Sequence, residues 1–376
     1  MIIIFISWFL VLLYVLFILR FYWSWTQLKV IELTTTQAQK ISMVIAIRNE
    51  EEQLTDLFKS IQDLDYPKSH YEVILVNDHS DDSSLLLMEQ FKSSDPELNI
   101  SIITLSEKEI GKKAALKNAF TKTKYDIIQC TDGDCILPQY WLQHCAQAFK
   151  NPKTKLISGG IKLIHDLSFF QRIQSLELLS LIASGGAAIG MQKPIMSNGA
   201  NMAFRKEILE INNEDVLQSH LASGDDVFLL QEVKKVYGAE AISFIKDQNY
   251  WVQTKAEPKV SEWINQRLRW VSKSAGYKDQ FLVFTSLLVF LVNLVLVILF
   301  IGSFFYFQLV NTLLYLFILK GITDYIFLKQ SASDSSQKHL VKWFIPLNFI
   351  YPFFISYTAI AGQFKGFTWK NRVYKK

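Results

Sequence analysis

Asp132 and Asp134, separated by one glycine, follow a run at residues 127–131 that begins with two isoleucines. A buried strand that ends in acidic groups delivers them to its carboxyl tip, where open α/β sheets bind their ligands. Two carboxylates can hold a divalent ion that keeps open positions for a diphosphate, because Mg²⁺ favours one or two carboxylates together with phosphate oxygens. An ordinary turn is the alternative, since Asp-Gly is a common turn pair.

A second acidic pair, Asp225 and Asp226, lies within residues 220–230, at the start of an apolar run. Where a helix opens, one carboxylate can cap its N–H groups while the other stays available for chemistry. Lys112 follows Gly111 at the expected start of another helix, where backbone N–H groups and an ammonium can meet a phosphate. A solvated lysine at a helix end is the alternative for Lys112.

Residues 263–270 place two arginines and two tryptophans on a short amphipathic helix, only ten residues before the apolar stretch that begins at Phe281. This helix can contribute to a binding site, or it can form the aromatic and basic belt of a membrane interface. Residues 197–205 form a turn-rich segment whose small side chains would permit close approach of a substrate.

Alternating strands and helices must position these groups. Apolar runs rich in branched residues predict strands at residues 41–47, 71–76, 100–105 and 127–132, with a further strand at 156–161. Helices are expected at residues 48–63, 83–93 and 112–122. This order predicts parallel βαβ units and an α/β fold. A later helix at residues 167–182 either lies in a membrane interface or packs on the domain.

Three stretches of the chain carry no charged side chain, at residues 1–19, 281–319 and 343–364. Since a membrane-spanning helix needs ~20 apolar residues, they supply one, two and one spans respectively. The first stretch lacks the basic beginning and small-residue cleavage site of a signal peptide, so we interpret it as a retained anchor. Arg20 and Lys29 follow it and predict a cytoplasmic middle region.

The net charge of +4 is modest for 376 residues, and no basic stripe with interleaved aromatic residues suggests a nucleic-acid partner. The three cysteines, Cys130, Cys135 and Cys145, show neither a disulfide framework nor metal-ligand spacing with histidine. We expect reduced, structural thiols.

Taken in order, these segments resemble a membrane-bound family 2 glycosyltransferase. The resemblance covers about residues 42–270 and extends loosely into the membrane helices. It depends on six features in the family's order: a strand into Arg-Asn-Glu, a strand into Asn-Asp, then Gly-Lys, Asp-Gly-Asp, Gly-Asp-Asp and Gln-x-x-Arg-Trp. The resemblance implies a GT-A, Rossmann-like nucleotide-sugar-binding domain flanked by transmembrane helices.

The family's pattern implies roles for the residues that bind the donor. Ala46, Arg48 and Glu50 would line the nucleobase site, Asp78 would bind the base or the ribose, and Lys112 would approach the diphosphate.

The same pattern implies that Asp132 lies near the ribose and the metal and that Asp134 coordinates Mg²⁺ or Mn²⁺. The family commonly has paired aspartates after the second strand. Here Asn77 precedes Asp78, so only the second carboxylate can take that role.

Asp226 matches the family's catalytic base, and Gln266, Arg269 and Trp270 match its motif at the donor and acceptor site. The base motif commonly reads Glu-Asp. Here it reads Asp225-Asp226, so Asp225 is the alternative base.

The expected domains are an N-terminal transmembrane anchor at residues 1–22, a cytoplasmic GT-A catalytic domain at 40–278, a transmembrane region at 279–364 and a basic tail at 365–376. The transmembrane region holds either three helices or two helices and a re-entrant segment. We expect the protein in the bacterial inner membrane.

The tail presents a topological conflict. Three spans after a cytoplasmic domain put it outside, whereas its basic residues favour the inside: Lys365, Lys370, Arg372, Lys375 and Lys376. Pro346 and Pro352 could break the last apolar stretch and let it re-enter, if other protein groups satisfy its backbone. We therefore predict a cytoplasmic tail.

The expected function is inverting transfer of a hexose or hexosamine from a nucleotide sugar, UDP-linked by preference, to a membrane lipid hydroxyl. A processive polysaccharide synthase is the first alternative, although four spans leave little protein for a polymer channel. A catalytically silent nucleotide-sugar-binding regulatory module is less favoured, because such a module needs no base. A transporter is disfavoured too, since Asn293 and Asn311 make no convincing ion path.

Overall fold

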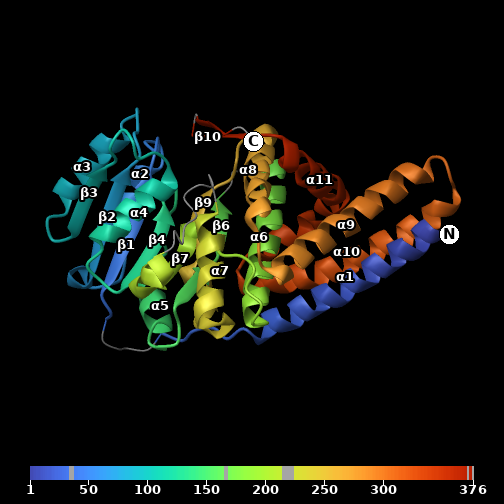
Figure 1. Ribbon diagram of the computed structural model, residues 1–376, viewed down its shortest axis with the longest axis horizontal. Helices are drawn as coiled ribbons and strands as arrows, with labels where there is room; N and C mark the ends of the chain where they lie inside the picture. Colours follow the sequence, from blue (N-terminus) through green and yellow to red (C-terminus); the bar gives the residue numbers. More distant parts are fainter. Residues whose placement is uncertain (34–37, 165–167, 214–223, 371, 375–376) are drawn as a thin grey trace. The chain divides into compact units, whose positions relative to one another are not determined.

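The computed structural model describes residues 1–33, 38–164, 168–213, 224–370 and 372–374, which form two compact units. The α/β unit comprises residues 29–164 and 192–255, and the helical unit comprises residues 1–28, 165–191 and 256–376 (Figure 1). Some residues named in the sequence predictions lie outside the described ranges. They include residues 220–223, Lys375 and Lys376.

A seven-stranded sheet in the order β3-β2-β1-β4-β7-β5-β8 forms the centre of the α/β unit. Its strands are β1 (Ile41–Ile47), β2 (Tyr71–Asn77), β3 (Asn99–Thr104), β4 (Ile127–Asp132), β5 (Leu156–Gly159), β7 (Met202–Arg205) and β8 (Ile242–Ile245). The first four strands run parallel, as the βαβ pattern predicts, whereas β7 runs antiparallel to β4 and to β5. The predicted α/β class is confirmed.

Helices pack on this sheet through their apolar faces. They are α2 (Leu54–Gln62), α3 (Ser84–Ser94), α4 (Lys112–Lys122), α5 (Trp141–Ala148) and α7 (Asp225–Tyr237). In α2, Leu54, Leu57, Phe58 and Ile61 repeat at helical spacing and are buried. Phe58 stacks on Phe91 of α3 with ring centroids 4.2 Å apart. Each such buried side chain contributes about 1.5–3 kcal/mol through the hydrophobic effect.

The prediction that a helix opens at residues 48–52 is wrong, because α2 begins only at Leu54. The preceding residues form a loop whose backbone N–H groups bond to the segment after β2. Glu50 donates its N–H to Ser84 Oγ at 2.9 Å, and Glu51 donates to Asp82 Oδ2 at 3.1 Å. These side-chain acceptors replace the helical pattern.

The strand expected at residues 156–161 is two strands. β5 ends at Gly159, and β6 (Ile161–Ile164) pairs instead with β9 (Val252–Lys255) in a separate two-stranded sheet. A Cβ atom at Gly160 would lie 2.0 Å from the Trp251 ring, so the chain can pass this buried tryptophan only as glycine.

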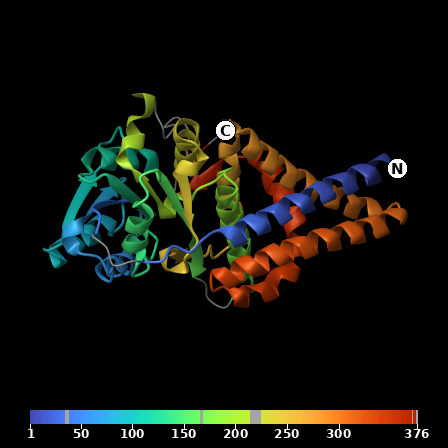
Figure 2. The same ribbon diagram turned by 90° about the horizontal axis from the view of Figure 1, so that it is seen from below.

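The helical unit contains α1 (Ile2–Gln27), α6 (Phe169–Gly190), α8 (Val260–Ser272), α9 (Gln280–Ser303), α10 (Gln308–Asp334) and α11 (Phe344–Phe364), followed by the hairpin β10 (Phe367–Trp369) and β11 (Arg372–Tyr374). Figures 1 and 2 show α1, α9 and α10 side by side. Five helical segments among the described residues are long and apolar enough to cross a membrane: α1, α6, α9, α10 and residues 338–364.

The boundaries of the two units differ from the expected domains. Residues 165–191 and 256–278 were expected within the catalytic domain at 40–278, but they belong to the helical unit. Most of α6 is buried, which favours packing against protein over a position in a membrane interface. Periodicity could not separate these alternatives, because α6 is apolar around most of its circumference.

α10 continues beyond the uncharged stretch that ends at Leu319. Lys320, which is 1% exposed, pairs with Asp324 one turn later at 2.6 Å. Tyr14 of α1 donates a hydrogen bond to the same carboxylate at 2.8 Å. Charges in an apolar helix bundle are tolerated when they are paired in this way.

α11 is continuous through Pro352, so the expectation that the prolines break the last apolar stretch is wrong. Pro346 lies in the first turn, where its missing N–H is not needed. In the second half of α11, Phe354 stacks on Trp263 of α8, with the ring centroids 4.0 Å apart. This contact stabilises α11 beyond the proline.

The hairpin β10–β11 follows α11 and contacts α8. Asn265 donates from Nδ2 to the Thr368 carbonyl oxygen at 2.5 Å, and Thr368 donates its N–H to Asn265 Oδ1 at 3.1 Å. The start of the basic tail is therefore attached to the helix that carries Gln-x-x-Arg-Trp. The cytoplasmic location of the tail stays a prediction.

Candidate active site

The carboxyl ends of three parallel strands meet at one edge of the sheet. Ala46 of β1 lies opposite Val76 of β2 and Asp132 of β4. β1 continues into Arg48 and β2 into Asp78. Because β1 lies between β2 and β4, this edge is the switch point at which such sheets bind ligands.

Arg48 joins the loops after β1 and β2. Its Nη1 donates to the carbonyl oxygens of Asp78 at 2.6 Å and His79 at 2.8 Å. Glu50, which is buried, packs against Gly133, since a Cβ atom there would lie 3.1 Å from Glu50 Cγ. The predicted nucleobase residues therefore lie beside the Asp-Gly-Asp turn.

Asp78 connects this loop to the start of α4. It is 2% exposed, and its Oδ1 accepts the Gly111 N–H at 3.1 Å. Asn77 uses its side-chain oxygen to accept the Ser80 N–H at 3.0 Å. Asn77 therefore shapes the loop, and the role of Asp78 in binding the base or the ribose stays a prediction.

Lys112 is surrounded by the predicted acidic residues. Its Nζ lies 2.5 Å from Asp132 Oδ1. Burial lowers the pKa of this ammonium, but the charges of Asp132, Asp225 and Asp226 raise it more, so its pKa lies above the ordinary lysine value. One positive charge faces three negative charges, which leaves an excess of negative charge for a cation to neutralise.

Asp225 and Asp226 lie at the first turn of α7, but neither is the N-cap, which is Gly224. Asp226 accepts the Val227 N–H at Oδ1, at 2.8 Å, and the Gly199 N–H at Oδ2, at 3.3 Å. Asp225 is 8% exposed, whereas Asp226 is half-buried. Of the two carboxylates, Asp226 is the more accessible to an acceptor.

Asp134 has a partner far along the chain. Thr254 on β9 donates its hydroxyl to Asp134 Oδ2 at 3.0 Å. Among the described residues, no three His, Cys, Asp or Glu side chains form a metal cage. Asp132 and Asp134 nevertheless fit a divalent ion whose remaining ligands are phosphate oxygens and water, as Mg²⁺ prefers.

Gln266, Arg269 and Trp270 lie on the partly exposed face of α8, while Trp263, Leu268 and Arg267 are buried. α8 belongs to the helical unit. The structure thus brings Lys112, the aspartates, Arg48 and Glu50 together within the α/β unit, and it assigns the predicted acceptor motif to the other unit.

Comparison with known proteins identifies the family of the α/β region, while the roles of the individual site residues stay predictions. Residues 42–211 match the model of glycosyl transferase family 2. They form a family 2 glycosyltransferase domain. The match confirms the resemblance and the enzyme class, and it ends before Asp225, Asp226 and residues 266–270, whose roles stay predictions.

Two curated relatives share part of this chain. Poly-beta-1,6-N-acetyl-D-glucosamine synthase from Staphylococcus epidermidis is 29% identical over 147 residues, which cover 39% of this chain and 34% of the relative. Glycosyltransferase AglE from Haloferax volcanii is 24% identical over 189 residues, covering 50% and 59% respectively. The alignment spans about a third of the synthase.

A solved structure resembles this chain in fold over nearly its whole length. It is the mannosyltransferase PcManGT from Pyrobaculum calidifontis in complex with GDP-Man and Mn²⁺. It matches with a TM-score of 0.60 and 16% identity, and covers 95% of each chain. At this identity the likeness establishes the fold, and the expected GT-A class is confirmed.

The three cysteines of the glycosyltransferase domain are free and buried, as structural thiols should be. Burial raises the pKa of the thiols of Cys145, Cys130 and Cys135, and the charges of Asp134 and Asp132 raise the pKa of Cys135 further. These side chains are therefore protonated, packed groups.

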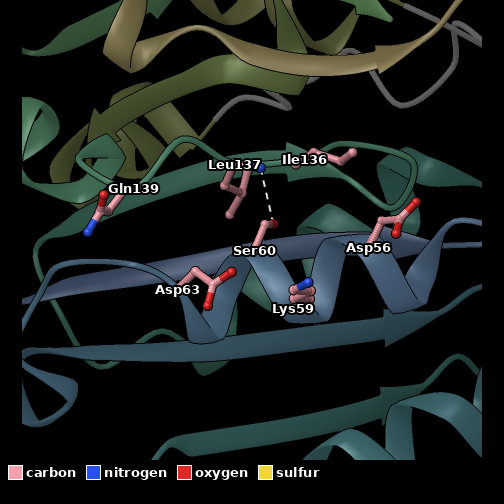
Figure 3. Close-up of a pocket in the computed structure, with 7 residues that line it drawn as sticks. All are labelled: Asp56, Lys59, Ser60, Asp63, Ile136, Leu137 and Gln139. Atoms are coloured by element: carbon pink, nitrogen blue, oxygen red, sulfur yellow. Dashed lines mark hydrogen bonds between the residues drawn. The ribbon is translucent and has the colours of Figure 1, made fainter.

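A surface pocket of about 530 Å³ lies between α2 and the loop after β4. Figure 3 shows Asp56, Lys59 and Asp63 along α2, and Ser60 Oγ accepting the Leu137 N–H at 3.1 Å. None of the predicted site residues is among those that line it. The glycosyltransferase site is thus defined by the strand ends and not by this pocket.

Sequence reasoning missed Thr254 and gave Gly199 no specific role. Gly199 contributes its backbone N–H to Asp226, and a Cβ atom there would lie 3.6 Å from Lys112 Nζ. The turn-rich composition around Gly199 was the one available signal. Nothing around Thr254 distinguishes it from an ordinary strand residue.

Proposed function

We propose that the chain is an inverting glycosyltransferase that moves a hexose or hexosamine from a UDP-linked sugar to a hydroxyl group of a membrane lipid. The observation that carries the proposal is the convergence of Lys112 with Asp132, Asp225 and Asp226 in a family 2 domain. Such a cluster offers charge stabilisation for a leaving diphosphate and a proton acceptor within one site.

The donor would bind across the ends of β1 and β2. Ala46, Arg48 and Glu50 would surround the base, and Asp78 would accept hydrogen bonds from the base or ribose. Arg48 supports this role because its two bonds to carbonyl oxygens fix the loop that carries Asp78. A GDP-linked sugar is the alternative donor, since PcManGT was solved with GDP-Man.

Asp132 and Asp134 would hold Mg²⁺ or Mn²⁺, and PcManGT was solved with Mn²⁺. When bound, this ion would neutralise charge on the leaving diphosphate. The Lys112 ammonium would act beside it, and its raised pKa keeps it charged at neutral pH. Thr254 would orient Asp134 through its hydroxyl group.

Asp226 would accept the proton of the acceptor hydroxyl as that oxygen attacks the anomeric carbon. The new C–O bond forms on the face opposite the breaking bond to the diphosphate, so the anomeric configuration inverts. General-base catalysis of this kind contributes about 10²–10⁴-fold. The greater exposure of Asp226 relative to Asp225 supports this assignment.

A lipid acceptor is supported by the position of α8 in the chain. Ten residues separate Trp270 from Phe281 in α9, one of the helices able to span a membrane. An amphiphile could therefore present its head-group hydroxyl near α8 while its chains stay in the bilayer. Exposing those chains would cost about 0.8 kcal/mol per CH₂ group.

The second candidate is a processive polysaccharide synthase. It is favoured by the match to the Staphylococcus epidermidis enzyme, whose name describes a poly-N-acetylglucosamine synthase. The shared segment of 147 residues covers 34% of that enzyme, so most of the enzyme lies outside the match. Nucleotide-sugar binding can therefore be alike while the acceptor differs.

The product separates the two candidates. Membranes containing the protein would be incubated with a panel of labelled UDP- and GDP-sugars, followed by partition into organic solvent. We expect one sugar on a hydroxylated lipid, extractable and constant in mass over time. A ladder that grows by one sugar, or a water-soluble polymer, would establish the processive alternative.

We also propose that the α/β unit lies in the cytoplasm of a bacterial cell, at the inner membrane. The basic residues Arg20 and Lys29, which flank the end of α1, support this orientation. Cytoplasmic nucleotide sugars would then reach the site directly.

A further inference from the structure

A buried ion pair joins α6 to α8 in the helical unit, where the two helices lie side by side (Figure 1). Glu177 is 1% exposed and Arg267 is 6% exposed. Arg267 Nε donates to Glu177 Oε1 at 3.0 Å, and Nη2 donates to Glu177 Oε2. This bidentate arrangement fixes the plane of the guanidinium group.

Two further contacts of Arg267 reach residues of the Gln-x-x-Arg-Trp motif. Its Nη1 donates to Gln266 Oε1. Its guanidinium carbon lies over the Trp270 ring, 4.1 Å from the ring centroid. Glu177 therefore sets the position of Arg267, and Arg267 in turn contacts the side chains of Gln266 and Trp270.

A second connection from α6 fixes the other end of Gln266. Gln266 Nε2 donates to Glu257 Oε1 at 2.8 Å. Gln174 holds the backbone of Glu257, because it accepts the Glu257 N–H at 3.2 Å and donates to the Glu257 carbonyl oxygen at 2.8 Å. Gln174 and Glu177 lie three residues apart on the same face of α6.

We propose that Glu177 and Arg267 are positioning residues for glycosyl transfer, which they support by holding Gln266 and Trp270 in one geometry. The inference rests on the proposed function, in which Gln266 and Trp270 are expected at the donor and acceptor site. No pattern in the sequence assigns such a role to Glu177, which lies 90 residues before Arg267.

Stability alone does not account for this arrangement. Well-packed apolar residues often replace a buried ion pair without loss of stability. What an apolar pair cannot supply is the donor to Gln266 and the cation over Trp270. Small misplacements at a reaction site can lower the rate by about 10²-fold, so this orientation affects turnover.

The test compares Glu177→Gln and Arg267→Lys with the wild type, in the full-length protein in membranes. Glu177→Gln removes the charge and keeps the side-chain shape, and Arg267→Lys keeps the charge and removes the planar fork. We expect kcat to fall about tenfold to hundredfold in both, with the Kd for the nucleotide sugar unchanged.

Asp324→Asn is the matched control. It disrupts another buried ion pair of the helical unit, with Lys320, at 2.6 Å. The Asp324 carboxylate contacts Lys320 and Tyr14, which lie outside the motif. We expect a lower unfolding temperature and an unchanged kcat. If Asp324→Asn lowers kcat as much as Glu177→Gln does, the effect is general destabilisation and the proposal is wrong.

A double variant tests the connection through Gln266. Gln266→Ala alone should lower kcat. Glu177→Gln should then lower kcat much less in the Gln266→Ala background than in the wild-type background, because the effects of residues that act through one another are not additive. Full additivity would overturn the positioning role. A wild type that transfers none of the sugars would refute the proposed function, whereas an active wild type matched in kcat by Glu177→Gln would refute this inference.

Discussion

The hydroxyl group of Thr254 should control metal affinity through Asp134. Thr254→Val removes the donor at 3.0 Å from Asp134 Oδ2 and keeps the shape of the side chain. Valine is well accommodated in strands, so β9 should still form. Thr254→Ser is the matched control, because it retains the hydroxyl group.

The size of the effect follows from the charge on Asp134. A hydrogen bond to a charged group contributes about 1.5–3 kcal/mol. At about 1.4 kcal/mol per factor of ten, Mn²⁺ binding should weaken roughly tenfold to hundredfold in Thr254→Val. Loss of a residue that orients a metal ligand typically has this range of effect.

The assay is a titration of Mn²⁺ into the protein with UDP present, following free Mn²⁺ by electron paramagnetic resonance. Thr254→Ser should bind close to wild type, and Asp134→Ala should bind least. Wild-type affinity in Thr254→Val, together with loss in Asp134→Ala, would refute the orienting role of Thr254. Wild-type affinity in both would move the metal site away from Asp134.

Three further outcomes are expected. Asp226→Asn should keep nucleotide-sugar binding and lose about 10²–10⁴-fold in transfer rate, whereas Asp225→Asn should lose less. If Asp225→Asn lowers turnover more than Asp226→Asn does, the two residues exchange roles. Chelation should abolish sugar transfer, and Mg²⁺ or Mn²⁺ should restore it. Asp134→Ala should be folded, as measured by circular dichroism, and inactive in the sugar-transfer assay. Full turnover by metal-stripped protein in excess chelator would exclude metal dependence. A cysteine appended after the last residue should resist an impermeant thiol reagent in intact cells, and its labelling would place the tail outside; the native cysteines are buried and add little background.

Local patterns predicted most of the strands and helices of the α/β unit. The strand at residues 41–47 and the helix at 112–122 have the predicted bounds. Strands buried in a parallel sheet are nearly continuous apolar runs, so they are conspicuous in a sequence. The acidic groups that follow them reach one edge of the sheet, because parallel strands end on the same side.

Local patterns failed where a partner from elsewhere in the chain decided the conformation. Glu50 and Glu51 suggested a first helical turn, but Ser84 and Asp82 bind their N–H groups and hold a loop. The strand expected at residues 156–161 divides at Gly160, where Trp251 approaches the backbone. Propensity describes a residue's own preferences and contains no information about such neighbours.

Sequence patterns alone predicted the candidate chemistry of this protein: a strand ending in Asp132 and Asp134, a lysine at a helix start, a second acidic pair and apolar helices beyond them. Which groups hold those residues in place became visible in the three-dimensional fold. Thr254 meets Asp134 across 120 residues, and Glu177 meets Arg267 across 90. A threonine in a strand and a glutamate in an apolar helix have many possible partners, and packing of the whole chain selects one of them.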